Sequence, residues 1–247
     1  MNGIEDNLFT RNWQEAARSS PTPTAVVCIS AHWLTRGDTR VTAMEAPPTI
    51  HDFGGFPEEL YGINYPAPGD PAKARDIGNL VSGTTIHPDH EWGLDHGTWT
   101  VVRHMYPEAD IPVLQISIDY SRQGDFHHMI GRELAALRRK GVLLIGSGNI
   151  VHNLRMVDFS KLSTPGYGYD WALETDALIR SKISRGEHQS LIHYEKLGAG
   201  GRLSIPTPDH YWPLLYILGA RMPGEEPAFF NQYAVGGAVT MTSLRFG

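Results

Sequence analysis

Two short runs of apolar residues put the strongest constraint on the fold of this chain. Residues 24–30 form a continuous apolar and β-branched run, and residues 142–145 form another. Runs of this kind, without alternation between apolar and polar side chains, are typical of strands buried on both faces of a sheet. The sequence therefore predicts an internal sheet that is covered by helices.

Helical patterns alternate with these strands. Asp70 as N-cap and Pro71 in the first turn predict a helix over residues 70–81, and Gly141 ends an amphipathic helix over residues 125–140. We expect further helices at residues 7–18, 97–105, 169–184 and 209–218, and further strands at 40–44, 111–118 and 238–246. This alternation predicts an α/β fold with a central mixed, largely parallel sheet flanked by helices. Since no linker divides the chain, we expect one domain over residues 1–247.

Composition excludes several classes of function. A net charge of -6 and the lack of a clustered basic face argue against nucleic-acid binding, because the basic run at residues 138–140 ends a predicted helix. No apolar stretch is long enough to span a membrane, and the first residues do not form a secretory signal, so we expect a cytoplasmic protein. The one cysteine, Cys28, lies in the first apolar run and is expected to be a small core residue.

Three histidines occupy similar positions in the predicted fold. His32 and His152 follow buried strands, and His210 starts a predicted helix. Ligands of α/β proteins gather at the carboxyl ends of strands, so these imidazoles could converge on a site for Zn²⁺ or Fe²⁺. Spacing alone leaves other roles open, namely a bond from His32 to a backbone carbonyl or helix capping by His152 and His210. The chain has no HExxH or CxxC motif to decide between them.

Six segments in the same order resemble the DODA-type extradiol dioxygenases. This is the LigB-like, class III extradiol family, which opens catechol rings and includes DOPA 4,5-dioxygenase, and the resemblance points to its bacterial members. The most specific segments are His-Asp-Phe-Gly-Gly-Phe-Pro at residues 51–57 and Gly-Leu-Asp-His-Gly at residues 93–97. The match runs over almost the whole chain, through residues 24–33, 48–57, 65–69, 93–99, 146–154 and 206–215.

The resemblance implies a role for each of several histidines. His32 and His210 would bind one divalent metal ion, Zn²⁺ or Fe²⁺. His152 would be the catalytic acid and base, close enough to bind the metal when substrate is absent, and His96 would line the site of a small aromatic diol that reacts with O2. His51 is expected either to touch the substrate or to pack its loop. The other histidines are expected to be surface or packing residues: His87, His90, His104, His127, His128, His188 and His193.

The resemblance also implies a missing segment. Family members carry a further metal-binding histidine, in a His-Gly-Ser-Pro segment, just before the residues that match Met1 and Asn2. We therefore expect this chain to lack the N-terminal strand and one metal ligand. Such a chain would bind metal weakly and have poor activity. The intact remainder of the pattern favours a start codon assigned too late over a decayed gene.

Two other functions remain open from the sequence. A zinc-dependent hydrolase would use the same histidines with a metal-bound hydroxide. A truncated, inactive relative could survive as a binding protein. We expect a monomer or a small homo-oligomer that binds neither nucleic acid nor membranes.

Overall fold

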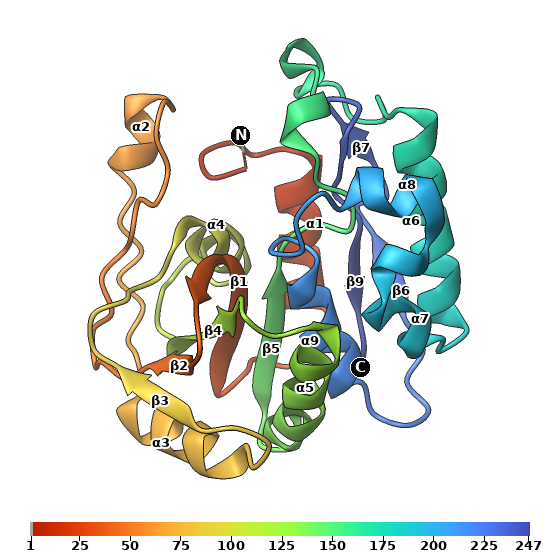
Figure 1. Ribbon diagram of the computed structural model, residues 1–247. Helices are drawn as coiled ribbons and strands as arrows, with labels where there is room; N and C mark the ends of the chain where they lie inside the picture. Colours follow the sequence, from red (N-terminus) through yellow and green to blue (C-terminus); the bar gives the residue numbers. More distant parts are fainter. Residues whose placement is uncertain (1) are drawn as a thin grey trace.

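A five-stranded sheet forms the centre of the molecule in the computed structural model, which describes residues 2–247 (Figure 1). The strands follow the order β3-β2-β4-β1-β5. β1 pairs in parallel with both β4 and β5, β2 pairs in parallel with β3, and β2 and β4 are antiparallel. The predicted mixed, largely parallel sheet is therefore confirmed. The strand bounds are β1 Ala25–Thr35, β2 Thr39–Thr42, β3 Ile86–Asp89, β4 Val113–Asp119 and β5 Val142–Ser147.

Successive side chains of β1 enter different cores, as the unbroken apolar run predicts. Val27 and Ile29 belong to a core that includes buried residues of α5 (Gly124–Arg138) and α9 (Trp212–Ala220). Val26 belongs to a second core with Trp99 of α4 (His96–Met105). Because side chains alternate along a strand, one run of apolar residues can bury both faces of the sheet. Cys28 is buried in this strand, as expected.

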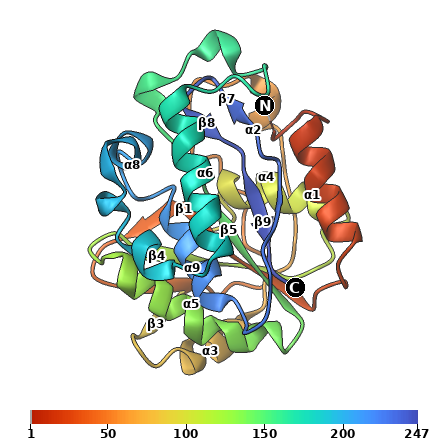
Figure 2. The same ribbon diagram turned by 90° about the vertical axis from the view of Figure 1, so that its right-hand side faces the viewer.

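Helices cover both faces of the sheet, and the C-terminal half adds a layer at one side (Figures 1 and 2). α5 and α9 pack against each other and against β5. On the other face, α4 packs against β1, and α1 (Leu8–Arg18) packs against α4. α3 (Pro71–Leu80) lies beside β2 and β3. The side layer contains α6 (Asp170–Ser184), α7 (His188–Ile192), α8 (Gly198–Ser204) and two small sheets, β6 (Ala228–Phe230) with β9 (Ser243–Arg245) and β7 (Ala234–Val235) with β8 (Val239–Thr240).

Most predicted elements are present, but the predicted closing strand is wrong. Residues 238–246 do not join the central sheet, because β8 and β9 within them pair with β7 and β6 instead. Two glycines with positive φ, Gly236 and Gly237, turn the chain back between β7 and β8. The sequence pattern also missed α7, α8, the short α2 (Glu58–Tyr61) and β3, an edge strand that contains Pro88.

β5 is an edge of the sheet, and a cavity runs beside it. Half of the backbone groups of an edge strand point away from its single partner, which here is β1. The cavity, of about 820 Å³, is lined by β5, by Trp13 of α1 and by residues near the C-terminus such as Phe246. The other end of the cavity reaches His32, near the carboxyl end of β1. Across residues 2–247, the structure contains no helix with the length and apolar character needed to cross a membrane.

Stability should be sensitive to the contact between α5 and α9. A Cβ atom on Gly131 of α5 would overlap the backbone carbonyl of Tyr216 in α9. Since a backbone carbonyl in a packed helix has little room to move, we expect Gly131→Ala to lower the free energy of unfolding by about 1–3 kcal/mol. Urea denaturation followed by circular dichroism measures this change.

Gly54→Ala is the matched control, because no atom lies within 4 Å of the Cβ that would be added there. Its free energy of unfolding should stay within about 0.5 kcal/mol of the parent. Equal stabilities for the two variants would contradict the close contact between the helices.

Candidate active site

Four histidines from separate parts of the chain lie in one continuous row. The ring centroids of His96 and His32 are 3.9 Å apart, and those of His32 and His210 are 5.2 Å apart. His152 stacks on His210, with centroids 3.6 Å apart and an interplanar angle of 10°. The structure thus brings together all four histidines that the sequence indicated for the site. The role of each one stays a prediction.

His32 lies within a strand rather than after it. The predicted strand ended at residue 30, but β1 continues to Thr35. Its pairing with β5 stops at Ser30, and its register with β4 shifts between Ile29 and Leu34. His32 therefore projects from a stretch in which the sheet no longer pairs regularly, beyond the end of β5.

His96 is the first residue of α4, and a buried polar network fixes that end of the helix. The carboxylate of Asp95, the N-cap, accepts hydrogen bonds from the backbone N–H of Thr98 at 3.0 Å and from the side chain of Gln115 at 2.7 Å. Gln115 in turn accepts from the backbone N–H of Asp95 at 2.8 Å. A Cβ on Gly97 would crowd the ring of His32, so glycine allows the start of α4 to approach β1. Sequence and packing together place His96 against His32.

His152 and His210 are held by loops, not by helix starts. The backbone N–H of His152 donates to the carbonyl of Ser204 at 2.9 Å, and an isolated bridge joins His152 to Val239. His210 precedes α9, which begins at Trp212 instead of the predicted residue 209. The N-cap positions of the helices that follow belong to Asn153 and Tyr211, so neither histidine caps a helix. Both positions depend on contacts between segments that are distant in the sequence.

Asn149 sets the protonation of the His210 ring. Its side-chain N–H donates to the carbonyl of Thr240 at 2.9 Å, which turns its Oδ1 toward His210. The distance from Oδ1 to Nδ1 of His210 is 3.3 Å. Because an amide oxygen only accepts, Nδ1 carries the hydrogen and the lone pair of Nε2 is left free. An imidazole held in this way is suited to bind a metal.

Asp52 is the site residue that the sequence analysis missed. Its Oδ2 lies 2.9 Å from Nδ1 of His96 and 3.5 Å from Nδ1 of His32. Donor atoms of Asp52, His32 and His96 all lie within 4.8 Å of one another, close enough to hold a metal ion. Asp52 follows His51 in one of the most specific segments of the family resemblance. This position was the sequence feature that could have identified Asp52 as a site residue.

Burial favours the neutral form of three imidazoles of the row, those of His32, His152 and His210. It lowers the pKa of His32, lowers that of His152 to about 4, and lowers that of His210 well below its usual value, with neighbouring histidines adding to the effect. Burial acts to raise the pKa of Asp52, but hydrogen bonds and charge from His96 outweigh it, so the net pKa is lowered. At neutral pH the site therefore presents neutral nitrogen donors and one carboxylate, which fits a divalent metal ion.

Residues 45–69, between β2 and α3, form an aromatic wall beside the row. Phe53 meets the ring of His96 edge to face, with centroids 5.3 Å apart, and also contacts Tyr61 and Trp99. Nε2 of His51 donates a hydrogen bond to the carbonyl of Ile63 at 2.9 Å, so the ring is held by its own loop. This contact accords with the expected packing role. His32, His96 and His210 line the end of the cavity that runs along β5.

The remaining histidines lie outside this row. His127 is buried and contacts the hydroxyl of Tyr216 at 2.9 Å, and His128 contacts His188 at 3.3 Å. His87 and His90 are exposed. These positions agree with the expected surface and packing roles.

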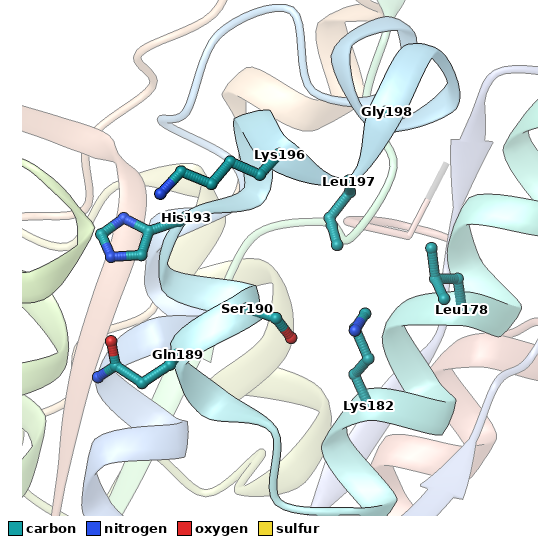
Figure 3. A pocket seen from close by; sticks show the side chains of 8 residues that line it. All are labelled: Leu178, Lys182, Gln189, Ser190, His193, Lys196, Leu197 and Gly198. Carbon is teal, nitrogen blue, oxygen red and sulfur yellow. The ribbon is translucent and has the colours of Figure 1, made fainter.

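A second hollow, of about 560 Å³, lies in the side layer, between α6, α7 and the start of α8 (Figure 3). Its lysine from α6, Lys182, is paired with Glu187 at 2.8 Å, and its histidine, His193, lies 3.8 Å from Asp125. None of the four histidines of the row lines it. It is therefore separate from the candidate active site.

Comparison with protein families decides the classification. Residues 4–239 match the family described as the catalytic LigB subunit of aromatic ring-opening dioxygenase. The chain belongs to the LigB family. This confirms the resemblance seen in the sequence and the predicted class of enzyme, an extradiol aromatic ring-opening dioxygenase.

Relatives in the LigB family agree with this assignment. The chain is 48% identical to 4,5-DOPA dioxygenase extradiol of Escherichia coli K12, over 100% of this chain and 91% of the relative. It is 34% identical to the Beta vulgaris protein of the same name, over 100% of this chain and 92% of that one. A crystal structure of an uncharacterized Escherichia coli K12 protein superposes with a TM-score of 0.85 at 41% identity, covering 99% of this chain and 94% of the other. The LigB-like α/β fold is thus confirmed as well.

Acid should destabilise the folded protein. His127 and His152 have pKa values of about 4 in the folded chain because burial opposes their charged forms, whereas histidine in an unfolded chain titrates near about 6.5. Between these values the unfolded chain binds protons that the folded chain does not, so stability falls as the pH falls. We expect a loss of about 2 kcal/mol for each of these two histidines between pH 7 and pH 5, measured by urea denaturation.

His127→Gln should reduce this pH dependence, because it removes one buried histidine with a lowered pKa and leaves the row of site histidines intact. The same free energy of unfolding at both pH values would contradict the neutral, buried state of these rings.

Proposed function

We propose that this protein opens the ring of a catechol-type substrate related to DOPA, using O2 and one divalent metal ion. Residues 1–247 would act as a single catalytic domain. The observation that carries the proposal is the row of four histidines, three of which line the cavity, in a chain of the LigB family. The names of the relatives, 4,5-DOPA dioxygenase extradiol, supply the class of substrate.

His32 and His210 would hold the metal, with His152 near enough to bind it before substrate arrives. His210 is prepared for this by Asn149, which leaves Nε2 of the ring unprotonated. Imidazole suits both Zn²⁺ and Fe²⁺, but Zn²⁺ has no redox chemistry, so we propose Fe²⁺ as the working ion. When bound, the ion would supply a Lewis acid for the two catechol oxygens and the redox capacity that O2 chemistry needs.

His152 would move the proton. Burial lowers its pKa to about 4, so at neutral pH its ring is a neutral acceptor for a catechol hydroxyl proton. Once protonated in a buried site, the imidazolium is a stronger acid than in water and returns the proton readily later in the reaction. Because the ring of His152 stacks on that of His210, this exchange would occur beside the proposed metal ligand.

His96 and Phe53 would orient the ring of the substrate. His96 lines the cavity, and Phe53 contacts the ring of His96 edge to face. We expect a flat diol to lie beside these two rings. The family match favours this reaction over the zinc hydrolase, because residues 4–239 match the family described as the catalytic LigB subunit of aromatic ring-opening dioxygenase.

Oxygen uptake tests the proposed reaction. Protein loaded anaerobically with Fe²⁺ should consume O2 when L-DOPA or catechol is added, and a yellow semialdehyde should form. The same protein loaded with Zn²⁺ should bind metal without consuming O2. Proton release from an ester by the zinc form, with no O2 uptake by the iron form, would instead support the hydrolase. Failure to bind either metal would support an inactive relative.

His152→Ala tests the assignment of the acid and base. We expect kcat, measured per bound metal ion, to fall by about 10²–10⁴-fold, because general acid–base groups contribute on this scale. His87→Ala is the control, since His87 is exposed on the edge strand β3 and should leave the rate unchanged. Undiminished turnover in His152→Ala would remove His152 from this role.

A further inference from the structure

Asp52 holds His96 at two points. Its Oδ1 accepts a hydrogen bond from the backbone N–H of His96 at 2.8 Å, and its Oδ2 lies 2.9 Å from Nδ1 of the same residue. A carboxylate that contacts both the backbone and the ring of one residue restricts the rotation of that ring. His96 is thereby fixed relative to the start of α4.

The same carboxylate decides which nitrogen of the ring carries hydrogen. An aspartate side chain is ordinarily ionised at neutral pH, and an ionised carboxylate only accepts hydrogen bonds. Nδ1 of His96 must then be the N–H, which leaves Nε2 with a free lone pair when the ring is neutral.

Asp52 also reaches the neighbouring histidine. Its Oδ2 lies 3.5 Å from Nδ1 of His32, whose ring centroid is 3.9 Å from that of His96. One oxygen therefore faces the Nδ1 atoms of a proposed metal ligand and of a proposed substrate-site residue. Since Nδ1 of each ring faces the carboxylate, Nε2 is the nitrogen available for other partners.

The loop that carries Asp52 is pinned close to these rings. The backbone of Ile50 donates to Leu94 at 2.7 Å, and Leu94 donates to Pro48 at 2.8 Å, so the loop pairs with the segment just before α4. The indole of Trp99 in α4 donates to the carbonyl of Ile50 at 2.9 Å. The side chain of Asp52 is only 14% exposed. A rigid, shielded carboxylate is the kind of partner that can set the tautomer of a histidine.

We propose that Asp52 is a positioning residue that holds His32 and His96 in the Nδ1–H form, so that Nε2 of His32 is presented to the metal and Nε2 of His96 to the substrate. The benefit of this role for catalysis rests on the proposed function, whereas the contacts of Asp52 with the two rings do not depend on it. Asp52 would act through the two histidines, because both of its oxygens face His96 and one of them also faces His32. Carboxylates commonly support metal-binding histidines in this way.

Nitrogen NMR of the histidine rings tests the proposal without metal or substrate. In the metal-free parent at neutral pH, His32 and His96 should each show a protonated Nδ1 and an unprotonated Nε2. Asp52→Asn keeps the shape of the side chain but removes the charge, and should produce a detectable population of the Nε2–H form on at least one of the two rings. Nε2–H forms of both rings in the parent would overturn the proposal, even if the variant failed to fold.

Zinc titration gives the second measurement. Asp52→Asn should weaken Zn²⁺ binding by about 10–100-fold, the usual effect of removing a supporting carboxylate. Complete loss of zinc binding by a folded variant would make Asp52 a direct ligand and would overturn the proposal, as would unchanged ring tautomers together with unchanged affinity. Asp70→Asn, at the N-cap of α3, is the control and should alter neither quantity.

These outcomes separate the proposal from the proposed function. If the parent showed the expected tautomers but consumed no O2 as the iron form, the ring-opening reaction would be contradicted while the role of Asp52 in orienting the rings would stand. If it consumed O2 but showed Nε2–H on both rings, only the role of Asp52 would be contradicted.

Discussion

The pairing of β1 with β4 on one side and β5 on the other supports the rest of the molecule. It places one strand in the middle of two hydrophobic cores, with α5 and α9 on one face and α4 on the other. Regular pairing with β5 ends at Ser30, so the chain that continues to His32 leaves the sheet where neighbouring segments converge. The site depends on this arrangement, since each of its other residues reaches His32 from a segment packed on the same frame.

Burial of polar rings gives the site its chemistry and lowers its stability in acid. A row of imidazoles in contact with one another cannot carry several positive charges, and removal from water opposes even one. The rings are therefore neutral donors before any metal arrives. Their orientation is set by fixed acceptors, Asn149 for His210 and Asp52 for His96, so the arrangement requires little reorganisation on binding.

Local sequence signals predicted the parts of the fold that local physics controls. Asp70 and Pro71 mark the start of α3 because capping satisfies free backbone N–H groups, and the apolar run of β1 predicts a strand buried on both faces. The signal failed at residues 238–246, where alternation suggested one long strand. The choice of partner for each half of that segment depends on β6 and β7, which no local pattern specifies.

The sequence by itself determined the α/β class, the buried strands and the identity of four histidines, through their positions near strand ends and the family resemblance. Only the tertiary structure decided that these rings form one row, that His152 and His210 stack, and that Asp52 from a distant loop bonds His96. The physical reason is that a hydrogen bond between residues 44 positions apart depends on how the loop packs against α4. Spacing along the chain carries no record of such a contact, whereas helix caps and apolar runs act between neighbours.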